Sequence, residues 1–220
     1  GIVSFDYQKL NRVTQQVVNN MDKVIRNNKY PIAQAKLSDD LHRPIGVGVQ
    51  GLADVFMMMG EPFDSKASRE INSNIFETIY FAALTASNKL AKRDGPYSSF
   101  STSMTAKGLF QHDLTDNPSV SKTLNWDWDA LRANVQHGAG LRHSLLTCLM
   151  PTAGTSIIME NSESIEVPTS FLYTRSTLSG RFQVVNKYLM KDLKKMGIWS
   201  EAIRDKLIQY DGSIQGIAEI

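Results

Sequence analysis

The sequence predicts an α/β protein, because long stretches with a helical spacing of apolar residues alternate with short apolar runs of strand length. Helical spacing extends over residues 5–26 and 65–93, and the short apolar runs lie at 45–49 and 145–150. No repeat, heptad array or low-complexity tract interrupts the 220 residues. We therefore predict that residues 1–220 form a single segment without an interior linker.

Two long helices are predicted from apolar residues that recur every three or four positions. In residues 5–26 they form one stripe, the pattern of a helix that packs on a core, and a Tyr-Pro pair ends the pattern. In residues 65–93 they form a seam that ends at Asp94-Gly95-Pro96. The stripe consists of Leu10, Val13, Val17, Met21 and Val24, and the seam of Ile71, Ile75, Ile79, Ala83, Ala86 and Leu90.

The remaining helices are predicted to be short. Residues 98–125 are polar and rich in Ser and Thr, so we predict a surface connection there. A helix over 126–136 would place Trp128, Leu131 and Val135 on one side. Asn186 is a good cap for a helix that runs to 196, and Ser200 for another that runs to about 210.

Residues 145–166 are the most informative stretch, because they combine a buried strand, a loop of small residues and the start of a helix. The apolar run 145–150 suits a strand that is buried on both faces. Thr152, Ala153, Gly154 and Thr155 are small, so a ligand could approach the backbone, and a helix could begin at Ser156. Such a turn directs amide N–H groups and hydroxyls at an anion. The alternative is an ordinary strand-to-helix turn in which Thr152 or Thr155 caps the helix.

Three glycines, Gly46, Gly48 and Gly51, match the dinucleotide-binding pattern G-x-G-x-x-G. That fold needs a strand before the first glycine, and residues 40–44 form a poor strand. We expect instead that these glycines allow close packing where a strand at 45–49 enters a helix at 52–58.

Metal binding is not expected in this chain. Its single cysteine, Cys148, lies in an apolar run, where we expect a buried and inert thiol. The four histidines show no i, i+4 pairing. Glu160, Glu163 and Glu166 recur every three residues and are expected to be solvated or capping side chains.

Composition excludes two classes of partner. The net charge of +2 gives no field that would attract nucleic acid or an acidic membrane surface. No apolar run approaches the roughly 20 residues that span a bilayer, and the sequence GIVSFDYQKL lacks the features of a signal peptide. We therefore expect a soluble, cytoplasmic protein.

Long strings of residues resemble the large catalytic subunit of ribonucleotide reductase. MPTAGT at 150–155 resembles the family's substrate-phosphate loop, and NSESIE, LYTR, LSGRFQVVN and DGSIQGI follow it in the family's order. Upstream, HRPIGVGVQGLADVF, IFETIYFAALTAS, LAKRDGPY and KGLFQHD are similar as well. The sequence of these strings is most similar to that of the aerobic class I branch. Gly154 and Val167 depart from its usual Ser and Pro, and Gly154 resembles the loop of the cobalamin-dependent branch, which leaves the class open.

The resemblance implies that the chain is most of the second half of a ten-stranded α/β barrel, with Thr152, Ala153, Gly154 and Thr155 as substrate-binding residues. A half-barrel leaves strand edges open, so the isolated piece should be marginally stable. The intact enzyme would reduce ribonucleoside diphosphates to 2′-deoxyribonucleoside diphosphates by thiyl-radical chemistry. That chemistry uses several cysteines, so one cysteine is too few and we assign no catalytic residue to this segment.

The same resemblance implies the partners of the intact enzyme. These are a second large subunit in a homodimer, a metal-containing small subunit that supplies the radical, a thioredoxin- or glutaredoxin-like dithiol reductant, and allosteric nucleotides. This segment itself is not expected to bind a cofactor. The alternative is a non-catalytic homologue, as found among viral large subunits, that serves as a binding or scaffold protein.

Overall fold

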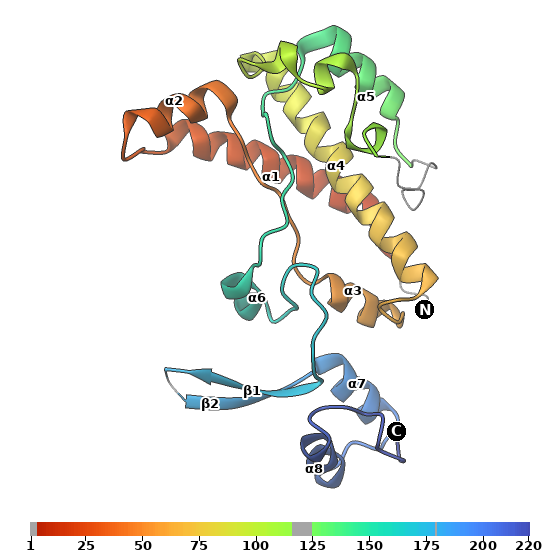
Figure 1. Cartoon of the computed structure of the whole chain (residues 1–220). Coiled ribbons are helices and arrows are strands. Elements are labelled where there is room, and N and C mark those ends of the chain that lie inside the picture. Colours follow the sequence, from red (N-terminus) through yellow and green to blue (C-terminus); the bar gives the residue numbers. More distant parts are fainter. Residues whose placement is uncertain (1–3, 116–124, 179) are drawn as a thin grey trace.

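The computed structural model describes residues 4–115, 125–178 and 180–220. Figure 1 shows an elongated molecule in which helices α1, α2, α4 and α5 form an upper body, while strands β1 and β2 and helices α7 and α8 form a lower body. Helices α3 and α6 lie between them. The buried hydrophobic residues form two clusters, one from Val18 to Leu146 and one from Leu172 to Ile217. Helices and a small sheet confirm the α/β class in its general form.

Helices α1 (Tyr7–Asn27) and α4 (Lys66–Asp94) pack against each other and form the centre of the upper body. The carboxylate of Asp6 caps α1, and the hydroxyl of Ser65 caps α4. Gly95, at φ +82°, ends α4. Both helices and the buried seam of α4 confirm the prediction from apolar spacing.

The predicted apolar stripe of α1 is only partly on the buried side: Leu10 and Met21 are half-buried and pack against the core, but the three valines do not. Val13, Val17 and Val24 are exposed, Val24 to 53%. The buried face lies one position further along and is largely polar, consisting of Asn11, Thr14, Val18, Asp22 and Ile25. The physical reason is Asp22, whose carboxylate is the centre of a cluster of arginines and therefore turns this face inward.

The segment after α4 was predicted to be a surface connection and is instead partly buried. It forms three 3₁₀ turns, η1 (Phe100–Thr102), η2 (Thr105–Lys107) and η3 (Gln111–Asp113). Phe110 is fully buried and contacts Trp128 with ring centroids 5.5 Å apart, so this aromatic side chain holds the segment on the core. Residues 116–124 of the predicted connection lie outside the described residues.

The predicted helix at 126–136 is confirmed in part. Helix α5 covers Trp128–Asn134, and a π-helical turn, η4, covers Val135–Ala139. Trp128, Leu131 and Val135 are buried on its inner side, as the spacing indicated.

The two predicted strands at 45–49 and 145–150 pair in parallel, but only through a single bridge, Val47 to Thr147. The expectation that 145–150 is buried on both faces was wrong, because only Leu146 is buried. Leu145 is 66% exposed, and Cys148 is exposed rather than buried. Alternate residues of an extended segment face opposite ways, and no described element of this chain covers the outer face.

The glycines of this region allow the close packing that was predicted. A Cβ atom at Gly46 would lie 2.9 Å from Cβ of Cys148, and one at Gly48 would lie 2.3 Å from the carbonyl oxygen of Cys148. Gly51, at φ +77°, then begins α3 (Leu52–Met59). Helix α2 (Ala33–His42), which the sequence pattern did not predict, has no buried residue.

The lower body is a β-hairpin followed by two helices. Strand β1 (Leu172–Thr177) pairs antiparallel with β2 (Gly180–Val185), with Leu172 opposite Val185. Asn186 caps α7 (Lys187–Lys195) by accepting from the amides of Tyr188 and Leu189, and Ser200 caps α8 (Glu201–Gln209). Both caps confirm the prediction.

Candidate functional site

The four predicted substrate-binding residues lie together at the start of α6 (Ala153–Met159), in the middle of the molecule. We call Thr152, Ala153, Gly154 and Thr155 the 152–155 loop. The helix begins at Ala153, three residues earlier than predicted, so most of the loop is the first helical turn. Thr152 precedes it in the left-handed region, at φ 58° and ψ 23°.

The 152–155 loop presents unsatisfied donors to solvent. The first amides of a helix have no intrahelical acceptor, which here concerns the N–H groups of Ala153, Gly154 and Thr155. All three residues are exposed. A Cβ atom at Gly154 would meet no atom within 4 Å, so the surface over this glycine is open. An anion could therefore approach the backbone here.

The alternative, in which a threonine hydroxyl caps α6, was wrong for both threonines. Thr152 stands at the capping position, but its Oγ1 accepts from the amide of Ser164 at 2.9 Å and makes no capping bond. The Thr155 hydroxyl donates to Oε1 of Gln50 at 2.7 Å and also lies 3.3 Å from the carbonyl oxygen of Thr152. Both hydroxyls instead anchor the loop to distant parts of the chain.

Residues 161–164 connect this loop to α3. The amide of Ser162 donates to Oδ2 of Asp54 at 2.7 Å, and the amide of Gly51 donates to the carbonyl oxygen of Ser162 at 2.8 Å. Asn161 packs on Gly51, because a Cβ at that glycine would lie 3.2 Å from its side chain. The loop is thus fixed from two sides, by the segment before α3 and by its own following turn.

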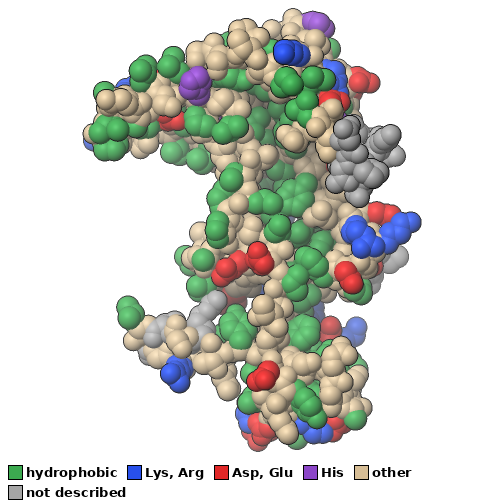
Figure 2. All heavy atoms as spheres, in the orientation of Figure 1, with side chains coloured by type: hydrophobic (Ala, Val, Ile, Leu, Met, Phe, Trp, Pro, Cys, Tyr) green, Lys and Arg blue, Asp and Glu red, His purple; other side chains and the backbone are tan. Residues whose placement is uncertain are grey.

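Two hollows lie beside α6, and none of the four loop residues lines either of them. One, of about 690 Å³, lies against Pro151, Asn161 and Glu166, and the other, of about 400 Å³, lies between Asp54, Glu160 and the start of α7. Figure 2 shows hydrophobic side chains exposed along this narrow middle of the molecule. Oδ1 of Asn161 and Oγ of Ser162 are buried here, and within the described part of the chain they have no hydrogen-bond partner.

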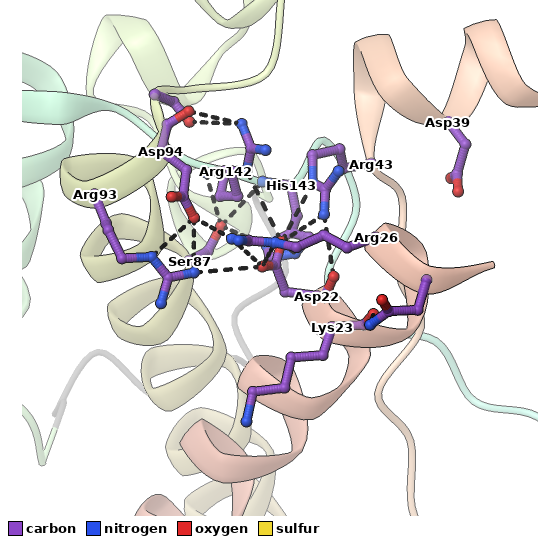
Figure 3. Close-up of polar contacts among 12 residues, drawn as sticks. Asp22, Lys23, Arg26, Asp39, Arg43, Ser87, Arg93, Asp94, Arg142 and His143 are labelled. Carbon is purple, nitrogen blue, oxygen red and sulfur yellow. Dashed lines mark hydrogen bonds and ion pairs between the residues drawn. The ribbon is translucent and has the colours of Figure 1, made fainter.

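A buried charged cluster, which the sequence did not reveal, lies at the other end of the segment that leads to this loop (Figure 3). Asp22 is its centre: Arg43 Nη2 donates to Oδ1 at 2.8 Å, and Arg26 Nε donates to Oδ2 at 2.9 Å. Asp22 is 1% exposed. We call the group the Asp22 network; its members are Asp22, Arg26, Arg43, Ser87, Arg93, Asp94, Arg142 and His143.

The environment shifts the pKa values of the acids in this network. Burial alone would raise the pKa of Asp22, but the hydrogen bonds and charges of Arg43 and Arg26 outweigh it and hold this pKa below its usual value. The hydrogen bond from Arg93 lowers the pKa of Asp94 to about 2. Both carboxylates are therefore ionised near neutral pH.

His143 is fully buried, and burial lowers its pKa to about 4, helped by the charges of Arg43 and Arg142. Ser87 fixes its tautomer. Oγ of Ser87 accepts from the amides of Arg142 and His143 at 3.0 and 3.1 Å, so its hydroxyl proton goes to Nδ1 of His143 at 3.0 Å. Neutral His143 consequently carries its proton on Nε2, which lies 3.5 Å from Oδ1 of Asp22.

Neither a metal site nor a membrane-spanning helix is found in residues 4–115, 125–178 and 180–220. Within these ranges, the structure brings no three His, Cys, Asp or Glu side chains into an arrangement that could hold a metal ion. Over the same residues, no helix has the length and apolar character needed to cross a membrane.

Comparison with known proteins identifies the family. The family model described as "Ribonucleotide reductase, barrel domain" matches residues 2–220, so the chain belongs to the ribonucleotide reductase family. It is 50% identical over 217 residues to the ribonucleoside-diphosphate reductase large chain of Neurospora crassa, covering 99% of this chain and 23% of that protein. It is 48% identical over 216 residues to the large subunit of Plasmodium falciparum, covering 98% of this chain and 26% of that one.

A viral relative is similar to the same extent. The chain is 45% identical over 211 residues to the ribonucleoside-diphosphate reductase large subunit of monkeypox virus, covering 96% of this chain and 27% of that protein. The chain thus spans about a quarter of the length of these curated relatives.

Proposed function

We propose that this chain is part of the large subunit of a ribonucleoside-diphosphate reductase and forms most of the second half of its ten-stranded barrel. The barrel-domain match over residues 2–220 supports this proposal, as do relatives at 45 to 50% identity whose names state that activity. The exposed outer faces of residues 45–49 and 145–150 agree with a partial barrel. The protein would act in the cytoplasm.

The 152–155 loop would hold the diphosphate of the substrate, and the single observation that carries this role is the exposed row of amides over Gly154. The N–H groups of the first helical turn lie at an exposed surface, and the Thr155 hydroxyl, which donates to Gln50 in this structure, lies beside them. Neutral donors on a fixed turn would orient the phosphates and thereby place the ribose, which matters because the reaction must distinguish one ribose position from its neighbours.

The reacting groups of the intact enzyme would come from outside this chain. Ribonucleotide reduction of this family's kind removes the 2′ hydroxyl as water while a pair of thiols becomes a disulfide. Cys148 is the single cysteine, so it could not form such a pair within the chain. A second large subunit, a metal-containing small subunit, a thioredoxin- or glutaredoxin-like reductant and allosteric nucleotides would complete the system.

Two substitutions in the intact large subunit test the phosphate role. Gly154→Val should place a branched side chain where the phosphate approaches, and Thr155→Val removes a hydroxyl at constant shape. We expect each to weaken ribonucleoside diphosphate binding by about 1–3 kcal/mol, the scale of a hydrogen bond to a charged group, measured by titration calorimetry. A Cβ added at Gly154 would meet no atom within 4 Å, so there is space for a substituent at this position in the absence of substrate.

Ala202→Val is the control, because it adds branched carbons at an exposed position of α8, away from the 152–155 loop. That variant should bind the diphosphate normally. Normal binding by both loop variants would refute the phosphate role. Diphosphate binding by a full-length protein that fails to turn over with its small subunit and a dithiol would instead favour the non-catalytic scaffold.

A further inference from the structure

The Thr155 hydroxyl has one proton, and in this structure that proton is already committed. Oγ1 of Thr155 donates to Oε1 of Gln50 at 2.7 Å, and the only other acceptor near it among the described residues is the carbonyl oxygen of Thr152 at 3.3 Å. A hydroxyl carries a single donor and two lone pairs. Thr155 therefore cannot donate to a phosphate oxygen while it donates to Gln50.

The side chain of Gln50 has the chemistry to release that proton. Its terminal amide carries an acceptor, Oε1, and a donor, Nε2, at almost the same reach, and a half-turn of the amide exchanges them. Within the described part of the chain Nε2 makes no hydrogen bond, so it is available. After the exchange, Nε2 would donate to Oγ1 of Thr155, and the threonine proton would be directed away from Gln50.

Gln50 is well placed for this function, because it is held at a fixed distance from the loop. It directly precedes Gly51, whose amide donates to the carbonyl oxygen of Ser162, and Ser162 in turn donates to Asp54. Gln50 is half-buried and lies in the segment that packs beside 145–148, so the contact with Thr155 joins residues 105 positions apart.

We propose that Gln50 is a positioning residue for the substrate phosphate: its side-chain amide turns from accepting the Thr155 hydroxyl to donating to it, and so frees the Thr155 proton for a phosphate oxygen. This inference rests on the proposed phosphate role of the 152–155 loop. Gln50 would act only by directing the hydroxyl proton of Thr155, and would not contact the substrate itself.

Two Gln50 variants separate this role from a merely structural one. Gln50→Met keeps the length and removes both polar atoms, whereas Gln50→Glu keeps the acceptor seen in the structure and cannot donate when ionised. The charge of the glutamate weakens diphosphate binding in either case, and its size is measured in the Thr155→Val background; after that correction, Gln50→Glu should bind substrate better than Gln50→Met if the bond in the structure simply holds the loop. The positioning role predicts the opposite order, because the carboxylate retains the Thr155 proton.

The experiment is a double-mutant cycle in the intact large subunit, with ribonucleoside diphosphate affinity measured by titration calorimetry and thermal unfolding measured on the same samples. We expect Gln50→Met to weaken binding by about threefold to tenfold, the range for one neutral hydrogen bond, and Gln50→Glu by more. In the Thr155→Val background Gln50→Met should have no effect, and only the charge effect of Gln50→Glu should remain. Gln209→Met, at the exposed end of α8, is the control.

The outcomes separate the two proposals. If Gly154→Val and Thr155→Val both leave diphosphate binding unchanged, the phosphate role of the loop fails; if Gly154→Val weakens binding but Thr155→Val does not, the loop amides hold the phosphate and only the positioning role of Gln50 is overturned. If Thr155→Val weakens binding but the Gln50 variants act equally in both backgrounds, or not at all, only the positioning role is overturned. Gln50→Asn keeps the amide but is too short to reach Thr155, so it should behave as Gln50→Met does and replaces that variant if it unfolds.

Discussion

Replacing His143 with glutamine removes a buried imidazole that binds a proton less readily in the folded state than in the unfolded state. This difference makes the free energy of unfolding depend on pH, so the substitution should reduce that pH dependence. His143 is fully buried and its pKa is lowered to about 4, first by burial and then by the positive charges of Arg43 and Arg142. Protonation would also place a second donor against the Ser87 hydroxyl, which already donates to Nδ1. In the unfolded chain the same histidine titrates near its ordinary value of 6.5.

The magnitude follows from these two pKa values. Between pH 6.5 and about 4 the unfolded chain binds a proton that the folded chain does not, so the free energy of unfolding decreases as the pH falls through this window. The difference between the unfolded pKa of 6.5 and the folded pKa of about 4, at about 1.36 kcal/mol per pKa unit, corresponds to a total change of about 3.4 kcal/mol in the free energy of unfolding. Of this, about 1.8 kcal/mol is lost between pH 7 and pH 5.

Urea unfolding of the 220-residue chain at pH 7 and pH 5 provides the measurement. We expect the loss of stability between the two pH values to be about 1.8 kcal/mol smaller in His143→Gln than in the wild type. His112, whose pKa is also lowered by burial, contributes equally to both proteins and cancels. An equal pH dependence in wild type and His143→Gln would refute the assignment.

Two further predictions concern the upper body, each measured by urea unfolding at pH 7. Asp22→Asn should destabilise the chain by about 3–5 kcal/mol, because it leaves the buried Arg43 without its counter-charge, while Asp40→Asn at an exposed ion pair should cost less than about 1 kcal/mol. Phe110→Ala should cost about 3–5 kcal/mol, because the ring is fully buried, whereas Leu114→Ala at a 47% exposed position should cost far less. Equal losses within either pair would contradict the burial argument.

Helix positions could be predicted from the sequence wherever local signals agreed. Asn186 and Ser200 each cap the helix that they were expected to cap, because a capping hydroxyl or amide acts on a backbone amide two or three residues away. The burial of Phe110 was not predicted, because its partner Trp128 is distant in the sequence. No local signal in a Ser- and Thr-rich segment indicates such an aromatic contact.

The position of the 152–155 loop could be predicted, but the action of its hydroxyls could not. Small residues after an apolar run indicated an open turn, and the open space over Gly154 agrees. The partners of the hydroxyls, Gln50 for Thr155 and the amide of Ser164 for Thr152, come from tertiary folding. Of the two alternatives that the sequence offered for Thr155, capping of the helix was wrong, and donation to a phosphate stays a prediction.

The inner face of α1 shows why a buried charge can outweigh several apolar side chains. Two sets of residues on α1 recur at helical spacing, and the more apolar set, which includes Val13, Val17 and Val24, is the exposed one. Turning these three valines inward would expose Val18 and Ile25, so the net gain would be that of about one buried side chain, about 1.5–3 kcal/mol. It would also remove Asp22 from Arg43, which is itself buried, and breaking a buried ion pair costs about 3–5 kcal/mol. Arg26, Arg93, Arg142 and His143 all face the same carboxylate, so more than one interaction would be lost. Apolar periodicity alone therefore locates this helix but does not determine its rotation about its own axis.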